Sequence, residues 1–251
     1  MNKFFTVNVN PVMTYANRNN TFQTGDLVSD WFAFDLPNGG NKLISAYLIG
    51  EPGALPQIFS TEVVFAKDLV VGNKIIAPFS LGTVTNSANG GTYQSHLLGF
   101  LQSFESSQTT TNLDFGYMQR LTTESKDTNQ NEIVLQGHPD TGTLKGLSRI
   151  YVGILSSSST SDLDLRAGTL TNGGGTAGDA TLTVDGTSAF RVMSVGDQLI
   201  DEDEQELGTI ESINGLGTII TFDKNGLLNT VGNSKRVATK SPIKLVLGFE
   251  R

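Results

Sequence analysis

The sequence predicts an all-β protein, in which a jelly-roll-like β-sandwich is followed by a small β-barrel or hairpin module. Short apolar or alternating runs recur along the chain, and turn-forming residues separate them. Gly accounts for 28 of the 251 residues, and Thr, Ser and Asn are also abundant. Thr favours strands, whereas Gly and Asn accept the positive φ of tight turns, so this composition is typical of strands joined by short connections.

Charge and cysteine content exclude several classes of function. The chain has 25 Asp and Glu against 17 Lys and Arg, and this acidity argues against binding to nucleic acid through its phosphates. The absence of Cys excludes disulfide scaffolds, zinc knuckles and thiol chemistry. The apolar run 4–7 is too short for a secretory signal, and no stretch approaches the roughly 18–20 residues that span a bilayer. We expect a soluble protein made in the cytoplasm, without a nucleic-acid or membrane partner.

The first domain, residues 1–161, holds the strands predicted for the sandwich. Asp-Leu-Pro-Asn-Gly-Gly at 35–40 predicts a hairpin connection, because Pro fixes φ and the residues after it accept positive φ. The segment 93–106 leaves helix and strand open, since Leu97 and Leu101 share a helical face but Gly99 interrupts it. The predicted strands are Phe4–Val9, Trp31–Leu36, Lys42–Ile49, Ile58–Phe65, Glu132–Leu135 and Arg149–Leu155.

A serine-rich segment, Ser156–Ser161, is the predicted domain boundary, because such segments behave as solvated linkers. The second domain, residues 162–251, contains five closely spaced strand candidates. Its final strand, 242–249, resembles Arg149–Leu155 in length and character and leaves two arrangements open. Either this strand completes the small module, or it returns to the first domain and makes residues 166–240 an insertion. The five candidates are Ala180–Val184, Gln198–Ile200, Gly208–Ile213, Thr218–Phe222 and Ile243–Phe249.

Two segments contain residues that could bind a ligand. Gly173–Gly178 has the spacing of a dinucleotide-binding loop, but strand-like residues follow it, so we interpret it as a Gly-rich loop. Asp201–Glu206 places five carboxylates between two strands and could hold Ca²⁺ or Mg²⁺. Consecutive residues on a hairpin tip cannot all converge on one ion, so a solvated turn is the preferred interpretation. Asp162 and Asp164 are interpreted as linker charges.

The two histidines, His96 and His138, lie in no hydrolase or metalloprotease motif. We therefore predict no catalytic, cofactor-binding or metal-binding residues and no enzymatic activity. A hydrolase with paired carboxylates is kept as an alternative hypothesis, and it requires a cleft that contains an acid of strongly shifted pKa.

Several short motifs resemble those of β-sandwich virion proteins of tailed bacteriophages. In the first domain they are a Gly-Asp strand entry at Thr24–Val28, a glycine-flanked core strand at Asn38–Ile49 and an apolar strand at Leu147–Leu155. The second domain is similar to small β modules of phage structural proteins, through the strands Val195–Ile200, Leu207–Ile213 and Thr218–Phe222.

The resemblance implies a capsid decoration, or cement, protein that binds the major capsid protein and contributes no catalytic residues. It also implies a homotrimer on the capsid surface of the virion, since three-fold positions between capsomers offer three equivalent docking surfaces. The alternative is a carbohydrate- or receptor-binding module of a phage fibre or an adhesin. That function requires an exposed platform around Trp31 or Tyr93.

Overall fold

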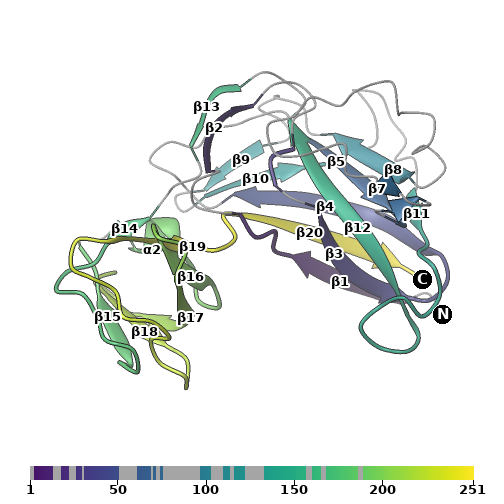
Figure 1. Cartoon of the computed structure of the whole chain (residues 1–251). Helices are drawn as coiled ribbons and strands as arrows, with labels where there is room; N and C mark the ends of the chain where they lie inside the picture. The colour runs from purple at the N-terminus through teal and green to yellow at the C-terminus, as the bar shows by residue number, and fades with distance from the viewer. Residues whose placement is uncertain are drawn as a thin grey trace.

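The chain folds into a β-sandwich and a smaller β-barrel beside it (Figure 1). The predicted all-β class is confirmed: every strand pair is antiparallel, and the one α-helix of the described residues is the four-residue α2 (Ala189–Val192). No helix in this part of the chain is long and apolar enough to cross a membrane. The computed structural model describes residues 3–13, 18–22, 27–29, 31–50, 61–68, 70–71, 74–75, 97–102, 110–113, 116–121, 133–156, 160–164, 168–185 and 189–251.

Two sheets form the sandwich. The first sheet has the order β1 (Phe4–Val9), β20 (Ile243–Glu250), β4 (Asn41–Gly50), β10 (Gly116–Arg120) and β9 (Thr110–Leu113), and β11 (Ile133–Leu135) also pairs with β4. The second sheet has the order β3 (Phe32–Pro37), β12 (Leu147–Ser156), β5 (Thr61–Ala66) and β8 (Leu97–Gln102). Two short ribbons pair β2 (Asn19–Phe22) with β13 (Thr160–Asp164), and β6 (Val70–Val71) with β7 (Lys74–Ile75).

The path of the chain between the two sheets is that of a jelly roll. It runs from β1 to β3, back to β4, across to β5 and β8, back to β10, and then through β12 to β20. The resulting sheet orders, β1-β20-β4-β10 and β3-β12-β5-β8, are those of an eight-stranded jelly roll. The expected jelly-roll-like sandwich is therefore present.

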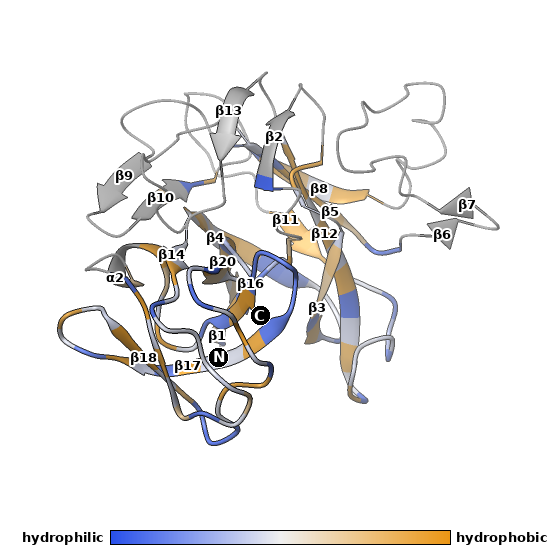
Figure 2. Cartoon of the chain, turned by 60° about the vertical axis from the view of Figure 1, so that its left-hand side comes forward, coloured by the Kyte–Doolittle hydropathy of each residue, from blue (hydrophilic) through white to orange (hydrophobic). Residues whose placement is uncertain are grey.

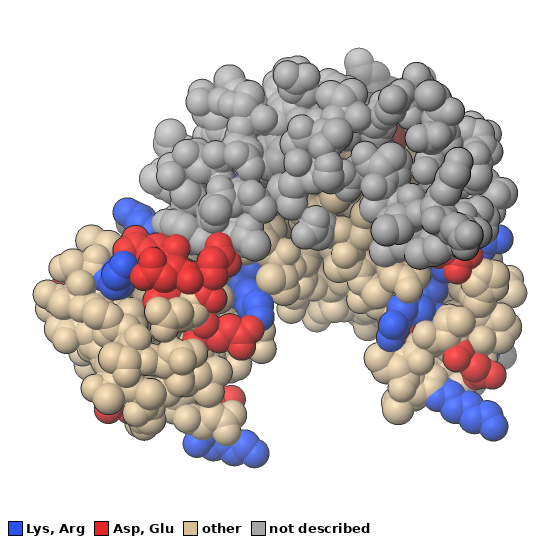
Figure 3. Space-filling view, in the orientation of Figure 1, with Lys and Arg blue, Asp and Glu red and all other residues tan. Residues whose placement is uncertain are grey.

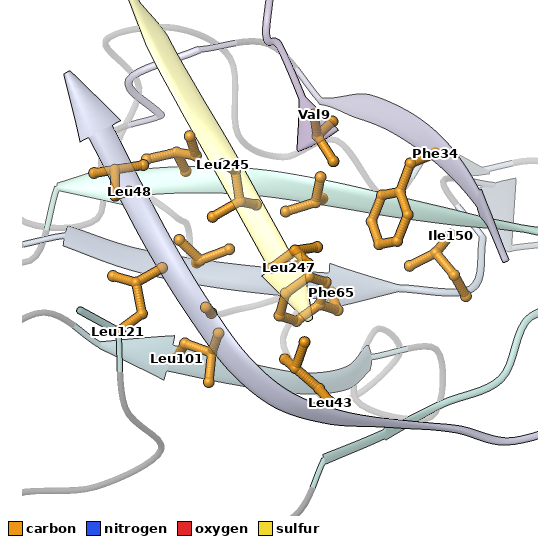
Figure 4. Packing of buried hydrophobic residues seen from close by; sticks show 14 of the residues in the cluster. Val9, Phe34, Leu43, Leu48, Phe65, Leu101, Leu121, Ile150, Leu245 and Leu247 are labelled. Carbon is orange, nitrogen blue, oxygen red and sulfur yellow. The ribbon is translucent and has the colours of Figure 1, made fainter. Parts of the chain in front are cut away.

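Alternating apolar side chains fill the space between the sheets. In β20, Ile243, Leu245, Leu247 and Phe249 are all fully buried, whereas the residues between them are partly exposed. Figure 4 shows Leu245 and Leu247 among buried side chains from both sheets. Figure 2 shows the hydrophobic stretches of β5, β8 and β11. Each fully buried side chain of this size stabilises the fold by about 1.5–3 kcal/mol relative to an exposed one.

The predicted hairpin at 35–40 is wrong, because its flanking strands do not pair. β3 pairs with β12 and β4 pairs with β20, so the segment carries the chain from one sheet to the other. A turn is nevertheless formed: Asn41 Nδ2 donates hydrogen bonds to the carbonyl oxygens of Pro37 (2.9 Å) and Gly39 (3.1 Å). Turn residues determine a local reversal, but distant strands decide which sheet each flanking strand joins.

The ambiguous segment 93–106 contains a strand, β8, at residues 97–102, and its remaining residues lie outside the described ones. Its register with β5 shifts near Gly99. A Cβ atom at Gly99 would lie 3.0 Å from Ile133 Cγ2, so this glycine allows β11 to approach β8 closely.

The domain boundary lies later than predicted. Ser156 ends β12, and the chain beyond it forms β13, which pairs with β2 of the first half. Of the two arrangements left open for the final strand, the structure has the return to the first domain: β20 lies between β1 and β4. Residues 168–240 are therefore inserted between β12 and β20, and the second domain is not 162–251. The four buried side chains of β20 explain this, since they complete the core of the sandwich.

The inserted residues form a small closed barrel. An isolated β-bridge joins Thr171 to Val184, and Asp185 N donates to Leu170 O (2.8 Å), so the two end strands are linked. Its separate apolar core includes Leu199, Ile220 and Phe222. The strand order is β14 (Thr169–Leu170), β19 (Arg236–Thr239), β16 (Gln198–Asp201), β17 (Glu206–Ile213), β18 (Ile219–Phe222) and β15 (Thr181–Thr183).

Polar contacts hold the barrel against the sandwich. The buried Arg18 donates from Nη2 to the carbonyl oxygens of Met13 (2.9 Å) and Lys240 (3.1 Å). On β20, Lys244 Nζ lies 2.7 Å from Oδ1 of Asp197, a barrel residue whose side chain is almost fully buried. These contacts join the barrel to the sandwich in addition to the chain connections.

Candidate functional site

The acidic hairpin Asp201–Glu206 joins β16 to β17, as expected for a turn. The buried Asp201 accepts hydrogen bonds at Oδ1 from the backbone amides of Asp203 and Gln205, both at 2.9 Å. Its carboxylate therefore stabilises the turn. Within the described ranges, no three His, Asp or Glu side chains gather in an arrangement that could hold a metal ion.

Lysines neutralise part of this hairpin. Lys235 Nζ lies 2.9 Å from Asp203 Oδ2 and 3.0 Å from Glu202 Oε1, and Lys240 contacts Glu206. The hydrogen bonds to Asp203 and then to Glu202 raise the pKa of Lys235 above its ordinary value. Figure 3 shows this acidic patch on the barrel with basic side chains beside it.

The Gly-rich segment 173–178 packs against another loop of the barrel. Gly175 and Val231 exchange two backbone hydrogen bonds of 2.9 Å, and a Cβ atom at Gly174 would lie 2.7 Å from Val231 O. The strand β15, and not a helix, follows this segment. The segment thus has a structural role in the barrel and lacks the helix N-terminus that a dinucleotide phosphate requires.

The other polar candidates lie apart from one another. His138 Nε2 lies 2.9 Å from Asp68 Oδ2 on the sandwich, and His96 is outside the described residues. Asp162 and Asp164 lie in β13, which corrects their interpretation as linker residues.

Trp31 packs flat on the outer face of the second sheet. A Cβ atom at Gly153 would lie 3.3 Å from Trp31 Cδ2 and Cε2, so the indole occupies the space that this glycine leaves. It belongs to a small apolar cluster with Leu27, Val64 and Leu155. The indole therefore covers the sheet, and Tyr93, the other residue of the expected platform, lies outside the described residues.

Two carboxylates fix the loop of residues 137–146 between β11 and β12, which is here called the docking loop after the role proposed for it. The Oδ2 atom of Asp35, on β3, accepts hydrogen bonds from the Thr143 amide (2.6 Å) and hydroxyl (2.5 Å). Its Oδ1 atom accepts one from Arg149 Nε (3.4 Å). One carboxylate thus joins the loop to two strands of the second sheet.

A second carboxylate joins the docking loop to the turn before β4. Asp140 Oδ1 accepts hydrogen bonds from Gly146 N (2.8 Å) and from Asn38 Nδ2 (3.0 Å), and these two bonds lower the Asp140 pKa. Asn38 Oδ1 accepts a return bond from Asp140 N (3.2 Å). Asp140 has a φ of 57°, a conformation that Asp tolerates better than most residues.

The docking loop exposes an apolar side chain at a fixed position. Leu144 is 69% exposed, and the exposed Lys145 follows it. At the base of the loop, a Cβ atom at Gly137 would lie 2.4 Å from Arg149 O, so the backbone lies directly against β12. An apolar residue on a preorganised loop loses little conformational entropy on binding, which suits an interface anchor.

From the sequence, only a turn at His138-Pro139-Asp140 can be predicted in this loop, because Pro and Asp favour turns. Asn38 and Asp140, which help to fix the loop, are recognisable in the sequence only as members of two separate turns, and the fold brings these turns together.

No protein-family model matches the chain, and no curated protein matches it either.

Acid should release the docking loop. Burial alone raises the pKa of Asp35, but the hydrogen bonds from Thr143 and Arg149 outweigh burial and lower the pKa below 3.8. The stabilisation is therefore present above pH 3.8 and lost as the pH falls through the lowered pKa. We expect the amide resonance of Thr143 to remain in its bound position at pH 4 and to shift at lower pH. Asp35→Asn should show the released position at pH 7, and a Thr143 shift completed by pH 5 would contradict this assignment.

Proposed function

We propose that this chain is a structural virion protein, a capsid decoration (cement) protein of a tailed bacteriophage that binds the major capsid protein and stabilises the shell. The docking loop is the observation that carries the proposal, because two carboxylates hold it rigid while Leu144 remains 69% exposed. The jelly roll supports the proposal, since many capsid proteins have this fold. A fold alone does not determine function, so the argument depends on the loop.

One loop is too small for stable attachment, and this favours several copies acting together. Specific protein interfaces bury at least about 1,000 Å², far more than one Leu side chain and its neighbours provide. Linked docking surfaces raise the effective concentration of each remaining contact. We therefore propose a homotrimer that presents three docking loops to three equivalent sites on the shell. Light scattering after size-exclusion chromatography should give the mass of three chains, and a monomer at micromolar concentration would contradict this arrangement.

Substitution of Leu144 tests the docking loop directly. We expect Leu144→Asp to weaken binding to purified particles that lack the protein by at least about tenfold, because a desolvated charge replaces an apolar anchor. Leu216→Asp is the matched control, since Leu216 is 70% exposed at the tip of the β17–β18 hairpin. Co-sedimentation with the particles measures both affinities.

Two results would contradict the proposal. One is the absence of the chain from purified wild-type particles. The other is equal loss of binding for both variants, which would show that position 144 has no special role. Saturable binding to a defined glycan, with no binding to shells, would favour the carbohydrate-binding alternative.

A further inference from the structure

The strand β1 forms an edge of the first sheet, and among the described strands it pairs with β20 alone. Next to this pair, Lys3 and Arg251 exchange two backbone hydrogen bonds of 3.0 Å. Hydrogen-bonded and non-hydrogen-bonded pairs alternate along antiparallel strands. The register therefore directs the N–H and C=O groups of Phe4, Thr6 and Asn8 away from β20, toward the open side of the sheet.

This edge lacks the features that normally prevent further pairing. Natural edge strands are protected by charged residues, prolines or bulges. β1, Phe-Phe-Thr-Val-Asn-Val, has no charge and no proline, and its register with β20 contains no shift. Both edges of the second sheet differ: β3 contains Asp35 and Pro37, and β8 has a register shift against β5. Among the described residues no strand pairs with these N–H and C=O groups of β1, so they are available to an added strand.

The sandwich core is incompletely covered beside this edge. Phe5 and Val7 of β1 and Phe32 of β3 pack against the main core but are only partly buried. Phe4 is 67% exposed on the opposite face of β1. An added strand with apolar side chains at every second position would cover Phe5 and Val7, while its backbone bonds the free groups of β1.

The surroundings of β1 favour a slim occupant. β1 lies along the lower side of the sandwich, with the barrel beyond one end and the docking loop near the other (Figure 1). In the same orientation, Figure 3 shows a hollow between the two projections. An extended segment needs only the width of one strand beside β1, whereas a second folded sandwich would have to approach β1 between the two projections.

We propose that β1 binds an extended segment of a partner protein as an added antiparallel strand, with apolar residues of that segment turned toward Phe5 and Val7. This interaction uses backbone hydrogen bonds and does not depend on the docking loop, so it holds whether or not the partner is a capsid shell.

The test uses the full chain and a synthetic peptide that copies residues 3–11, in which apolar side chains occupy every second position from Phe5 to Val9 and Lys3 is the single charged side chain. The peptide should shift and protect the backbone amides of Phe4, Thr6 and Asn8 in NMR spectra. The amides of Phe5 and Val7, which bond β20, should change little.

Thr6→Pro should weaken peptide binding by about tenfold or more, because it removes an edge N–H group that does not bond β20. Thr6→Val is the matched control, since valine retains the N–H group and favours a strand. Amide exchange at Val7 verifies that the β1–β20 ladder survives in each variant.

A modified peptide keeps the test independent of the folding of the proline variant. N-methylation of the peptide amides that face β1 should abolish binding to the unmodified chain, whereas methylation of the alternate amides should not. Equal effects of the two methylation patterns, or no binding at millimolar peptide, would overturn the proposal. A dimer of the full chain that Thr6→Pro dissociates would also overturn it, by assigning the edge to a second copy.

Discussion

Replacing Phe249 with alanine should lower the free energy of unfolding of the sandwich by about 3–5 kcal/mol. Phe249 is fully buried on β20, the strand between β1 and β4. Its ring stacks on that of Phe5 with centroids 5.4 Å apart and lies 6.4 Å from that of Phe34 in the facing sheet. The substitution therefore removes packing within one sheet and between the two sheets.

Denaturant unfolding followed by tryptophan fluorescence measures this effect, because Trp31 is the single Trp of the chain and packs on the second sheet of the sandwich. Phe4→Ala is the matched control: this side chain is 67% exposed, and its removal should change stability by less than about 0.5 kcal/mol. A similar small effect for Phe249→Ala would mean that β20 does not complete the core.

Replacing Phe222 with alanine should lower the free energy of unfolding of the barrel by about 3–5 kcal/mol. The unfolding transition of the sandwich should stay at the same denaturant concentration. Phe222 is 2% exposed and belongs to a core whose members all come from residues 182–237. Hydrogen exchange of the Ile210 amide, which bonds within the barrel, reports the loss. Trp31 fluorescence should change at the same denaturant concentration as in the unsubstituted chain.

Leu216→Ala is the control for the barrel, since this side chain is 70% exposed at a hairpin tip. If Phe222→Ala moves the Trp31 transition as far as Phe249→Ala does, the two cores unfold as one cooperative unit. That result would contradict the independence of the inserted barrel.

Local patterns in the sequence predicted most strands but not their partners. The first predicted strand, Phe4–Val9, has the same bounds in the structure, because the alternation of its side chains is a local property. The turn at 35–40 was also recognisable, yet its flanking strands belong to opposite sheets. Similarly, a serine-rich segment indicated a boundary at Ser156–Ser161, but long-range pairing with β2 continues the first unit beyond it.

The docking loop was missed for a related physical reason. Its stability depends on Asp35 and Asn38, which lie about a hundred residues before the loop and bond it only after both sheets have formed. Side-chain bonds between distant turns leave no periodic pattern in the sequence. The sequence does not single out the exposed Leu144 either, since an isolated apolar residue in a polar segment is common on protein surfaces.

The position of β20 between β1 and β4 sets an order of events during synthesis on the ribosome. The two strands that it separates emerge early, whereas β20 follows the entire inserted barrel. Until β20 emerges, β1 and β4 therefore lack the strand that pairs with both of them, whereas the barrel, whose contacts are local, can already fold. Such late closure slows folding and leaves apolar surface open to aggregation, so maturation of this protein should respond strongly to chaperone supply and translation speed.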